Sequence, residues 1–235
     1  MTRFRYVDLA GAEPAEAVVV IDVLRAVTVE AWMYARGARR VLAVSSRQYA
    51  ARLRDARLSS ALLAGEQSGR RVEGFDLGNS PSEVSRHDLT GAVIVHRTSA
   101  GTQGLTRTVG SRLVLAAALV NAGATARALR AASVDEVTFV ITGASLGRDG
   151  DEDLAAAELI AARVRGEDPD TAAFVARVRA SDAARPFHDD TQQWAPAADL
   201  AMACEVDRFT TPLTAHPAEE PDVVEVRAGA GPPAG

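Results

Sequence analysis

Ala17-Val-Val-Val-Ile-Asp22 is the stretch that decides the fold of this chain, because five consecutive apolar residues end at a carboxylate. An uninterrupted apolar run of this length is typical of a strand that helices cover on both faces. A helix is expected next, and Gly37 is the residue type that commonly follows a helix C-terminus. Outward from this unit, short β-branched runs alternate with longer stretches rich in alanine, leucine and arginine. The alternation predicts a three-layer α/β fold, with a largely parallel or mixed sheet and helices on both faces.

The same pattern assigns residue ranges to the other elements. Further strands are expected at Arg40–Val44, Ala61–Ala64, Ala92–Val95, Leu113–Ala117, Glu136–Ile141 and Val206–Leu213. Helices are expected at Thr28–Arg36, Gln48–Arg57, Asp151–Arg165 and Pro169–Ala180, and after Gly101 and Asn121. Ser80-Pro81-Ser82-Glu83 has the residues of a capping box, which predicts another helix start. We expect one domain over residues 1–214 and a flexible tail, rich in proline and glycine, over residues 215–235.

Composition excludes several classes of protein. The chain has 235 residues, 47% of them hydrophobic and 24% charged, so it can bury a core without a disulfide or a structural metal. One cysteine, no signal-peptide pattern and no apolar run near the roughly 20 residues of a membrane span predict a cytoplasmic protein without membrane contact. Acidic residues outnumber basic ones 31 to 26, and no basic stripe is present, which argues against a nucleic-acid partner.

All 26 basic residues are arginines. The absence of lysine excludes Schiff-base catalysis, a lysine general base and the Walker loop that cradles nucleotide phosphates. Arginine is a permanently charged, planar donor whose geometry matches oxyanions such as phosphate and sulfonate. A cationic site in this chain is therefore expected to bind anions.

Polar residues follow the expected strands at the point where each strand ends. Asp22 and Arg25 follow the first strand, Glu66 follows the third, and Thr98-Ser-Ala-Gly-Thr102 follows the next. Asn121 and the acidic run Asp151-Glu-Asp153 come after two later strands. Because the carboxyl ends of parallel strands open onto one crevice, these groups are expected to face a single cavity. Carboxylates, arginines and hydroxyls together indicate a site for a hard cation and an anionic substrate.

The chain resembles the 2-phosphosulfolactate phosphatase family in the strings Val18-Val-Val-Ile-Asp22-Val-Leu-Arg25-Ala26, Gly65-Glu66 and Gly74-Phe-Asp76-Leu-Gly-Asn79-Ser80-Pro81, and then in Gly101-Thr102, Asn121 and Glu152-Asp153. The order and spacing agree from about Val18 to Leu213. The resemblance implies a magnesium-dependent phosphoric monoester hydrolase that converts 2-phosphosulfolactate to sulfolactate and phosphate on the route to coenzyme M. It also implies an α/β layered fold and a small anionic substrate; a homo-oligomer stays open.

The residue pattern and the resemblance together assign candidate roles. The expected catalytic residues are Asp22, Arg25, Glu66 and Asp76. The expected substrate-binding residues are Arg25, Asn79, Ser80, Thr98, Ser99, Gly101, Thr102 and Asn121. The expected ligands of Mg²⁺ are Asp22, Glu66, Asp76, Glu152 and Asp153. Each also has a purely structural alternative: Asp22, Ser80 and the Asp151–Asp153 run could simply cap or favour helix N-termini.

Three departures from the family pattern bear on the substrate. Ala100 stands where the family has an asparagine amide, and Gln67 stands where an arginine usually follows Gly-Glu. The late His-Gly-Arg-Arg string is absent near Phe187-His-Asp-Asp190. These changes affect the expected recognition of a sulfonate, and they keep a non-catalytic, anion-binding family member as an alternative function.

Two hydrolase alternatives are considered from other motifs. A haloacid-dehalogenase phosphatase is excluded, because Asp22-Val-Leu24 lacks the second aspartate of that class and the chain has no lysine to complete the site. Gly143-Ala-Ser145-Leu-Gly147 matches a serine-hydrolase elbow, although Arg148-Asp-Gly150 separates it from the next helix. A Ser145 triad is the weaker alternative because no histidine is well placed to complete it.

Overall fold

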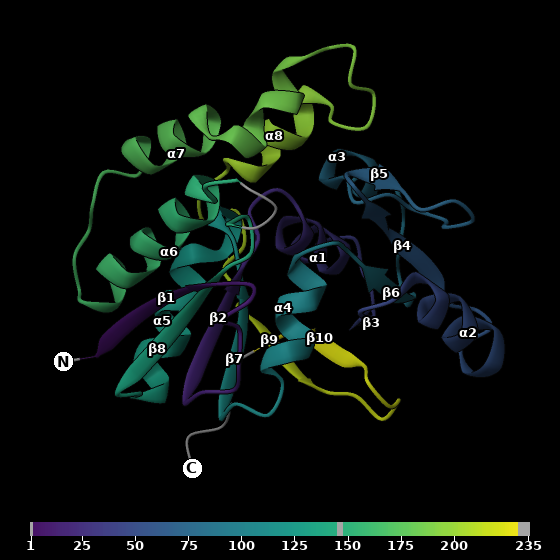
Figure 1. Ribbon diagram of the computed structural model, residues 1–235, viewed down its shortest axis with the longest axis horizontal. Helices are drawn as coiled ribbons and strands as arrows, with labels where there is room; N and C mark the ends of the chain where they lie inside the picture. The colour runs from purple at the N-terminus through teal and green to yellow at the C-terminus, as the bar shows by residue number, and fades with distance from the viewer. Residues whose placement is uncertain (1, 145–147, 230–235) are drawn as a thin grey trace.

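The computed structural model describes residues 2–144 and 148–229 (Figure 1). Within these residues, ten strands form one mixed sheet in the order β1-β8-β2-β7-β9-β10-β3-β6-β4-β5, with helices on both faces. The prediction of a three-layer α/β fold is thus confirmed. No described helix combines the length and the apolar character that crossing a bilayer would require.

The sheet consists of two parallel groups joined by an antiparallel hairpin. The first group contains β1 (Arg3–Asp8), β8 (Glu136–Ile141), β2 (Ala17–Ile21) and β7 (Leu113–Ala117). The second contains β3 (Arg40–Ala43), β6 (Val93–Arg97) and β4 (Leu62–Gln67), with the short β5 (Arg70–Arg71) paired antiparallel to β4 at the edge. The hairpin of β9 (Leu213–Pro217) and β10 (Val224–Ala228) pairs with β7 on one side and β3 on the other.

The helices are α1 (Ala26–Ala35), α2 (Arg47–Arg57), α3 (Pro81–Val84), α4 (Gly101–Thr108), α5 (Ala122–Ala132), α6 (Asp151–Val164), α7 (Thr171–Ala180) and α8 (Ala197–Ala203), with 3₁₀ turns η1 (Leu119–Asn121) and η2 (Asp182–His188). Figure 1 shows α1 and α4 between the two strand groups. Both contact β7, and α1 also contacts β10 while α4 also contacts β3. On the other side of the first group, α5 and α6 pack against β7 and β8. Every residue of β2 is fully buried, as its continuous apolar run predicts.

The expected tail is the main correction to the fold. Residues 213–228 form β9 and β10, and this hairpin is the only link in the described sheet between the two parallel groups. The boundary expected at residue 214 is therefore wrong, and the last strands lie at Leu213–Pro217 and Val224–Ala228 rather than at Val206–Leu213. Composition misled here because proline and glycine occupy the turns and the end of the segment, while Val224 and Val226 are buried in the sheet.

Most internal elements agree closely with their predicted ranges. β7 and β8 have the expected bounds, and α1, α2, α6 and α7 differ from the expected bounds by one or two residues at an end. The capping box at Ser80 is partly confirmed: Ser80 Oγ accepts a hydrogen bond from Glu83 N, but Glu83 bonds Gly78 N instead of Ser80 N. β1 was not predicted, although Arg3-Phe-Arg-Tyr alternates polar and apolar residues as a half-buried strand does.

Candidate active site

A cavity of about 300 Å³ lies at the carboxyl ends of β2, β4 and β6. We call it the strand-end cavity. The segment from η2 to Trp194 forms the opposite wall. Of the predicted site residues, it is lined by Asp22, Arg25, Glu66, Asn79, Thr98 and Ser99. The argument from parallel strand ends therefore brings together groups that are distant in sequence, as expected.

Asp22 is positioned by the end of β2 and the start of α1. Its Oδ1 accepts a hydrogen bond from Ala26 N at 2.8 Å, so the carboxylate also satisfies a free amide at the helix start. The side chain is 6% exposed and lines the strand-end cavity. The capping role and the functional role are thus both compatible with the geometry.

Asp153 joins two strand ends from the first turn of α6. Its Oδ1 accepts from Val23 N at 2.8 Å, and its Oδ2 accepts from Gly143 N at 2.7 Å and from the Thr142 hydroxyl at 3.2 Å. Both oxygens are therefore engaged by the ends of β2 and β8. Asp153 therefore links the ends of two strands through hydrogen bonds. The prediction had made it a metal ligand.

Glu152 is buried beside Asp153 but has a free oxygen. Its Oε2 is inaccessible to solvent and has no hydrogen-bond partner among the described residues. Gly143 makes room for it, because a Cβ built on that glycine would lie 2.1 Å from Glu152 Oε1. A buried carboxylate oxygen without a donor is costly unless a proton or a cation compensates it.

The three carboxyls Asp22, Glu152 and Asp153 share a perturbed electrostatic environment. Burial raises the pKa of Asp22 to about 6 and the pKa of Glu152 to about 7, and the negative charge of Asp22 adds to the shift of Glu152. The pKa of Asp153 is raised well above its ordinary value by burial and by the negative charges of Glu152 and Asp22. Bound positive charge would lower all three pKa values, so the group has the electrostatics of a cation site.

The described side chains do not form a closed metal cage. Within residues 2–144 and 148–229, no three His, Cys, Asp or Glu side chains converge on a point that could hold a metal ion. Magnesium commonly takes only one or two carboxylates and completes its octahedral shell with water and substrate phosphate oxygens. Asp22 lines the cavity and Glu152 Oε2 has no partner among the described residues, so these two acids would supply such ligands, although Glu152 itself does not line the cavity. Both Asp153 oxygens already accept backbone hydrogen bonds.

Glu66 organises the loop after β6 instead of offering a free carboxylate. Its Oε1 accepts from Ser99 N at 2.5 Å, and its Oε2 accepts from Gly69 N at 2.7 Å and Ser99 Oγ at 3.3 Å. The next residues form a reciprocal pair: Thr98 N donates to Thr102 Oγ1 at 2.9 Å, and Thr102 N donates to Thr98 Oγ1 at 3.1 Å. Thr98 and Ser99 line the cavity. Gly101 and Thr102 do not line it, and Thr102 holds Thr98 in place through the two hydrogen bonds above.

Arg25 is a buried cation held by a distant acid. Its Nη1 donates to Asp199 Oδ2 at 2.6 Å and to the Trp194 carbonyl at 2.9 Å, and its Nη2 donates to the Gly69 carbonyl at 3.1 Å. The guanidinium carbon lies 5.1 Å from the centre of the Phe187 ring and 5.9 Å from the Trp194 ring. Gly69 has a φ of +80°, and a Cβ there would lie 2.3 Å from Trp194, so only glycine fits beside the ring.

A second hollow, of about 490 Å³, adjoins the strand-end cavity. The two share Arg25, Gly69, Asn79 and Trp194 as a common wall. We call the second one the arginine hollow, because its lining includes Arg25, Arg70, Arg71 and Arg86. Glu83 is the one acid in this lining, and it pairs with Arg71. Ser80 lies here as well, and its hydroxyl donates to Asp199 Oδ1 at 2.8 Å.

Asn79 lies at the junction of the two hollows and is held from inside the core. Its Oδ1 lies 3.2 Å from Nε2 of His96, whose Nδ1 lies 3.0 Å from Glu30 Oε1. His96 and Glu30 are completely buried. His96 directly follows the strand expected at Ala92–Val95, but nothing in the sequence indicates its link from α1 to Asn79.

Two predicted site residues lie elsewhere. Asp76 is exposed, accepts from Leu63 N at 2.8 Å and lies 3.6 Å from Arg54, on the outer side of β4. Asn121 is buried and bonds Ala118 N and the Ala116 carbonyl at the end of β7. Neither lines the strand-end cavity, so the expectation that they join the site is corrected. In both cases the polar side chain satisfies nearby backbone, which sequence spacing does not reveal.

Other residues were missed by the sequence argument. Asp199, Trp194, Phe187 and Arg148 lie at the cavity or hold Arg25. Phe187 and Trp194 belong to the segment between α7 and α8, and Asp199 belongs to α8. A buried aspartate in the alanine-rich α8 was the one available signal, since such an acid requires a partner. Ser145, the alternative nucleophile, lies outside the described residues.

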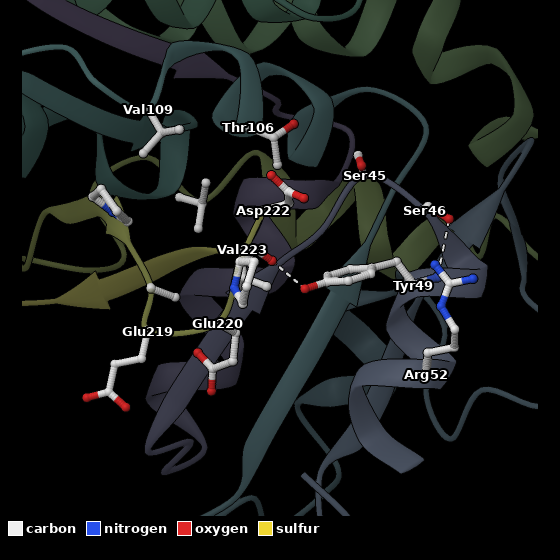
Figure 2. Close-up of a pocket in the computed structure, with 14 residues that line it drawn as sticks. Ser45, Ser46, Tyr49, Arg52, Thr106, Val109, Glu219, Glu220, Asp222 and Val223 are labelled. Atoms are coloured by element: carbon white, nitrogen blue, oxygen red, sulfur yellow. Dashed lines mark hydrogen bonds between the residues drawn. The ribbon is translucent and has the colours of Figure 1, made fainter. Parts of the chain in front are cut away.

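A larger cavity lies in another part of the molecule. It measures about 590 Å³ and lies between α2 and the turn of the β9–β10 hairpin, as Figure 2 shows. Its acids include Glu220, which pairs with Arg40, and the hydroxyl of Tyr49 donates to the Pro221 carbonyl across it. No predicted site residue lines it, so size alone does not locate the chemistry.

Comparisons with known proteins identify relatives of this chain. The family model described as 2-phosphosulpholactate phosphatase matches residues 6–209. A Deinococcus radiodurans protein named "Probable 2-phosphosulfolactate phosphatase" is 39% identical over 160 residues, which are 68% of this chain and 66% of that protein. Proteins with the same name from Synechococcus sp. RCC307 and Bacillus subtilis 168 are 35% and 29% identical, covering 83% and 80% of this chain and 79% and 81% of theirs.

The matched region contains every residue that lines the strand-end cavity. The relatives' shared name is that of a phosphoric monoester hydrolase, which agrees with the enzyme class expected from the sequence. Because the family model covers most of the chain, the chain belongs to the 2-phosphosulfolactate phosphatase family.

Proposed function

We propose that this protein is a magnesium-dependent phosphatase that hydrolyses a phosphorylated hydroxy acid bearing a sulfonate or carboxylate group. The reaction is the one named for its family: 2-phosphosulfolactate and water give sulfolactate and phosphate. We place it in the cytoplasm, on a route to coenzyme M. Support comes from the family, from the names of the relatives and from the buried acids at the cavity.

The observation that carries the proposal is the contrast between buried acids at one hollow and exposed arginines at the adjoining one. The strand-end cavity contains Asp22, whose charge acts on the buried Glu152, and this pair favours a cation and hence a phosphate. The arginine hollow contains Arg70 and Arg86, neither of which has an ion pair with a described residue. A substrate with a phosphate at one end and a second anion a few atoms away matches both surfaces.

Magnesium would be held by Asp22 and Glu152. When bound, it would neutralise the charge that develops on the phosphoryl oxygens during transfer. Hydrolysis breaks the bond between phosphorus and the ester oxygen, with water supplying a hydroxyl to phosphorus and a proton to the leaving oxygen. This account applies whether water attacks directly or a carboxylate attacks first.

The chain's own side chains would bind and orient the substrate. Arg25 is held rigidly, yet one Nη2 hydrogen and its Nε–H are not used in the contacts to Asp199, Trp194 and Gly69. Thr98 and Ser99 lie at the N-terminus of α4, where the helix dipole favours an anion, and the Ser99 hydroxyl already donates to Glu66. The Phe187 and Trp194 rings line the wall opposite the strand ends and lie beside the Arg25 guanidinium.

A substrate panel tests the proposal. Phosphate release is measured with 2-phosphosulfolactate, 2-phospholactate and p-nitrophenyl phosphate, each with added magnesium and with excess chelator. We expect turnover of the first two with magnesium and loss of turnover with chelator. Binding of these compounds without any phosphate release would favour the anion-binding alternative, to which Ala100 and Gln67 point.

A further inference from the structure

The core beneath the strand-end cavity contains a chain of three polar side chains from three elements. Glu30 comes from α1, His96 from β6, and Asn79 from the loop before α3. Their exposures are 0%, 0% and 5%. The contacts are 3.0 Å from Glu30 Oε1 to His96 Nδ1 and 3.2 Å from His96 Nε2 to Asn79 Oδ1. Such a network is costly to bury, so it calls for a reason.

The hydrogen on the ring follows from the Asn79 contact. Asn79 Oδ1 can only accept a hydrogen bond, so the 3.2 Å contact requires a hydrogen on His96 Nε2. On the other side of the ring, the 3.0 Å contact from Nδ1 to Glu30 Oε1 holds the imidazole in this orientation.

This contact determines which end of the Asn79 amide faces the substrate. Because Oδ1 points back to His96, the Nδ2 group is the end directed toward the cavity wall that Asn79 shares between both hollows. An amide nitrogen there is a donor for phosphate or sulfonate oxygens. A reversed amide would present an acceptor and repel the same anion.

We propose that His96, supported by Glu30, is a positioning residue that holds Asn79 with its amide nitrogen toward the anionic substrate. The inference rests on the proposed function for the identity of the substrate. It does not require turnover, because the orientation of Asn79 also governs binding of inorganic phosphate. Neither His96 nor Glu30 lines the cavity, so neither needs to touch the substrate.

A double-mutant cycle in kinetics is the first test. We expect Asn79→Ala and His96→Leu each to raise KM for 2-phosphosulfolactate about tenfold, the size expected for loss of one hydrogen bond to a charged group. In the Asn79→Ala background, His96→Leu should change KM less than about twofold, because the group that it positions is already absent. His96→Gln, which keeps a donor, should restore part of the loss. His87→Gln, at an exposed histidine outside both hollows, is the matched control.

A binding measurement covers the cases in which a variant is inactive or unstable. The side-chain amide signal of Asn79 in a ¹⁵N spectrum, assigned by its loss in Asn79→Asp, should shift on titration with inorganic phosphate in the wild type. It should shift at about tenfold higher phosphate in His96→Leu or Glu30→Gln. Additive effects on KM, or an Asn79 signal whose phosphate response is unchanged in these variants, would overturn the inference. Absence of turnover with an intact response would refute only the phosphatase activity.

Discussion

The strand-end cavity and the arginine hollow share a wall of Arg25, Gly69, Asn79 and Trp194, but differ in charge and in how that charge is held. The first contains Asp22 and lies near the buried Glu152 and Asp153, and burial raises the pKa values of all three. The second has exposed arginines on a surface hairpin and on the residues after α3. Buried charge destabilises the fold unless it is compensated, whereas exposed charge is solvated. We therefore expect substitutions in the strand-end cavity to change both stability and turnover. Substitutions in the arginine hollow should change substrate binding alone.

The largest expected effect is on catalysis in the cavity. Asp22→Asn should lower kcat for 2-phosphosulfolactate at least about a thousandfold, a loss of about 4 kcal/mol, because under the proposed function it removes a charge that would hold the cation at the phosphate. The measurement is phosphate release under saturating magnesium. Asp76→Asn is the matched control, since Asp76 lies outside the cavity and its variant should retain turnover. Retention of wild-type kcat in Asp22→Asn would contradict the assignment of the cavity.

The next effect concerns the shared wall. Arg25→Gln should destabilise the protein by about 3–4 kcal/mol in urea unfolding, because it leaves the fully buried Asp199 without a cation. Asp199→Asn should cost a similar amount. The double variant should lose clearly less than the sum of the two, since each substitution removes the same ion pair. Additive losses would show that Arg25 and Asp199 act independently.

The next prediction concerns the pH dependence of stability that the buried Asp22 should cause. Burial raises the pKa of Asp22 from 3.8 to about 6, so between these values the folded protein binds more protons than the unfolded chain. Stability therefore falls as pH rises through this window and stays low above it. In excess chelator at pH 7.5, Asp22→Asn should melt roughly 5 °C above the wild type, a gain of about 2–3 kcal/mol.

The same difference should shrink as the pH approaches about 4, where the wild-type carboxyl is protonated in the folded state. Under the proposed function, magnesium should raise the melting temperature of the wild type more than that of the Asp22→Asn variant, because the cation would bind the ionised carboxylate of the folded protein. Thermal denaturation in buffers across this range, with and without magnesium, is the measurement. A lower melting temperature for Asp22→Asn in neutral chelating buffer would refute the claim that the ionised Asp22 carboxylate destabilises the folded protein.

The smallest effect is expected in the arginine hollow. The Arg70 side chain has no ion pair or hydrogen bond with a described residue, and its guanidinium carbon lies 6.0 Å from the centre of the Trp194 ring. Arg70→Gln should raise KM for 2-phosphosulfolactate about tenfold and leave KM for p-nitrophenyl phosphate unchanged, because the second compound has no second anion. Arg57→Gln removes the same charge outside both hollows and should leave both KM values as they are. Equal changes in KM for the two substrates would show that the arginine hollow does not recognise the second anion.

Local pattern was sufficient for the buried strands of the first parallel group. β2, β7 and β8 are continuous or nearly continuous apolar runs, and a run of this kind has few alternatives to a buried strand. Placing Asp22 at the carboxyl end of β2 required only that the next residue be polar. The same logic failed for Asp76 and Asn121, because a strand end offers backbone donors as well as a crevice.

The sequence by itself determined the α/β class, the buried strands and the gathering of Asp22, Arg25, Glu66, Thr98 and Ser99 at their ends, because those features depend on short-range periodicity. Only the tertiary structure decided which groups meet across long separations. It inserts the β9–β10 hairpin between the parallel groups, pairs Arg25 with an acid 174 residues away and sets Glu30 and His96 beneath Asn79. Those contacts depend on strand order and on the burial of charge, which no local pattern records.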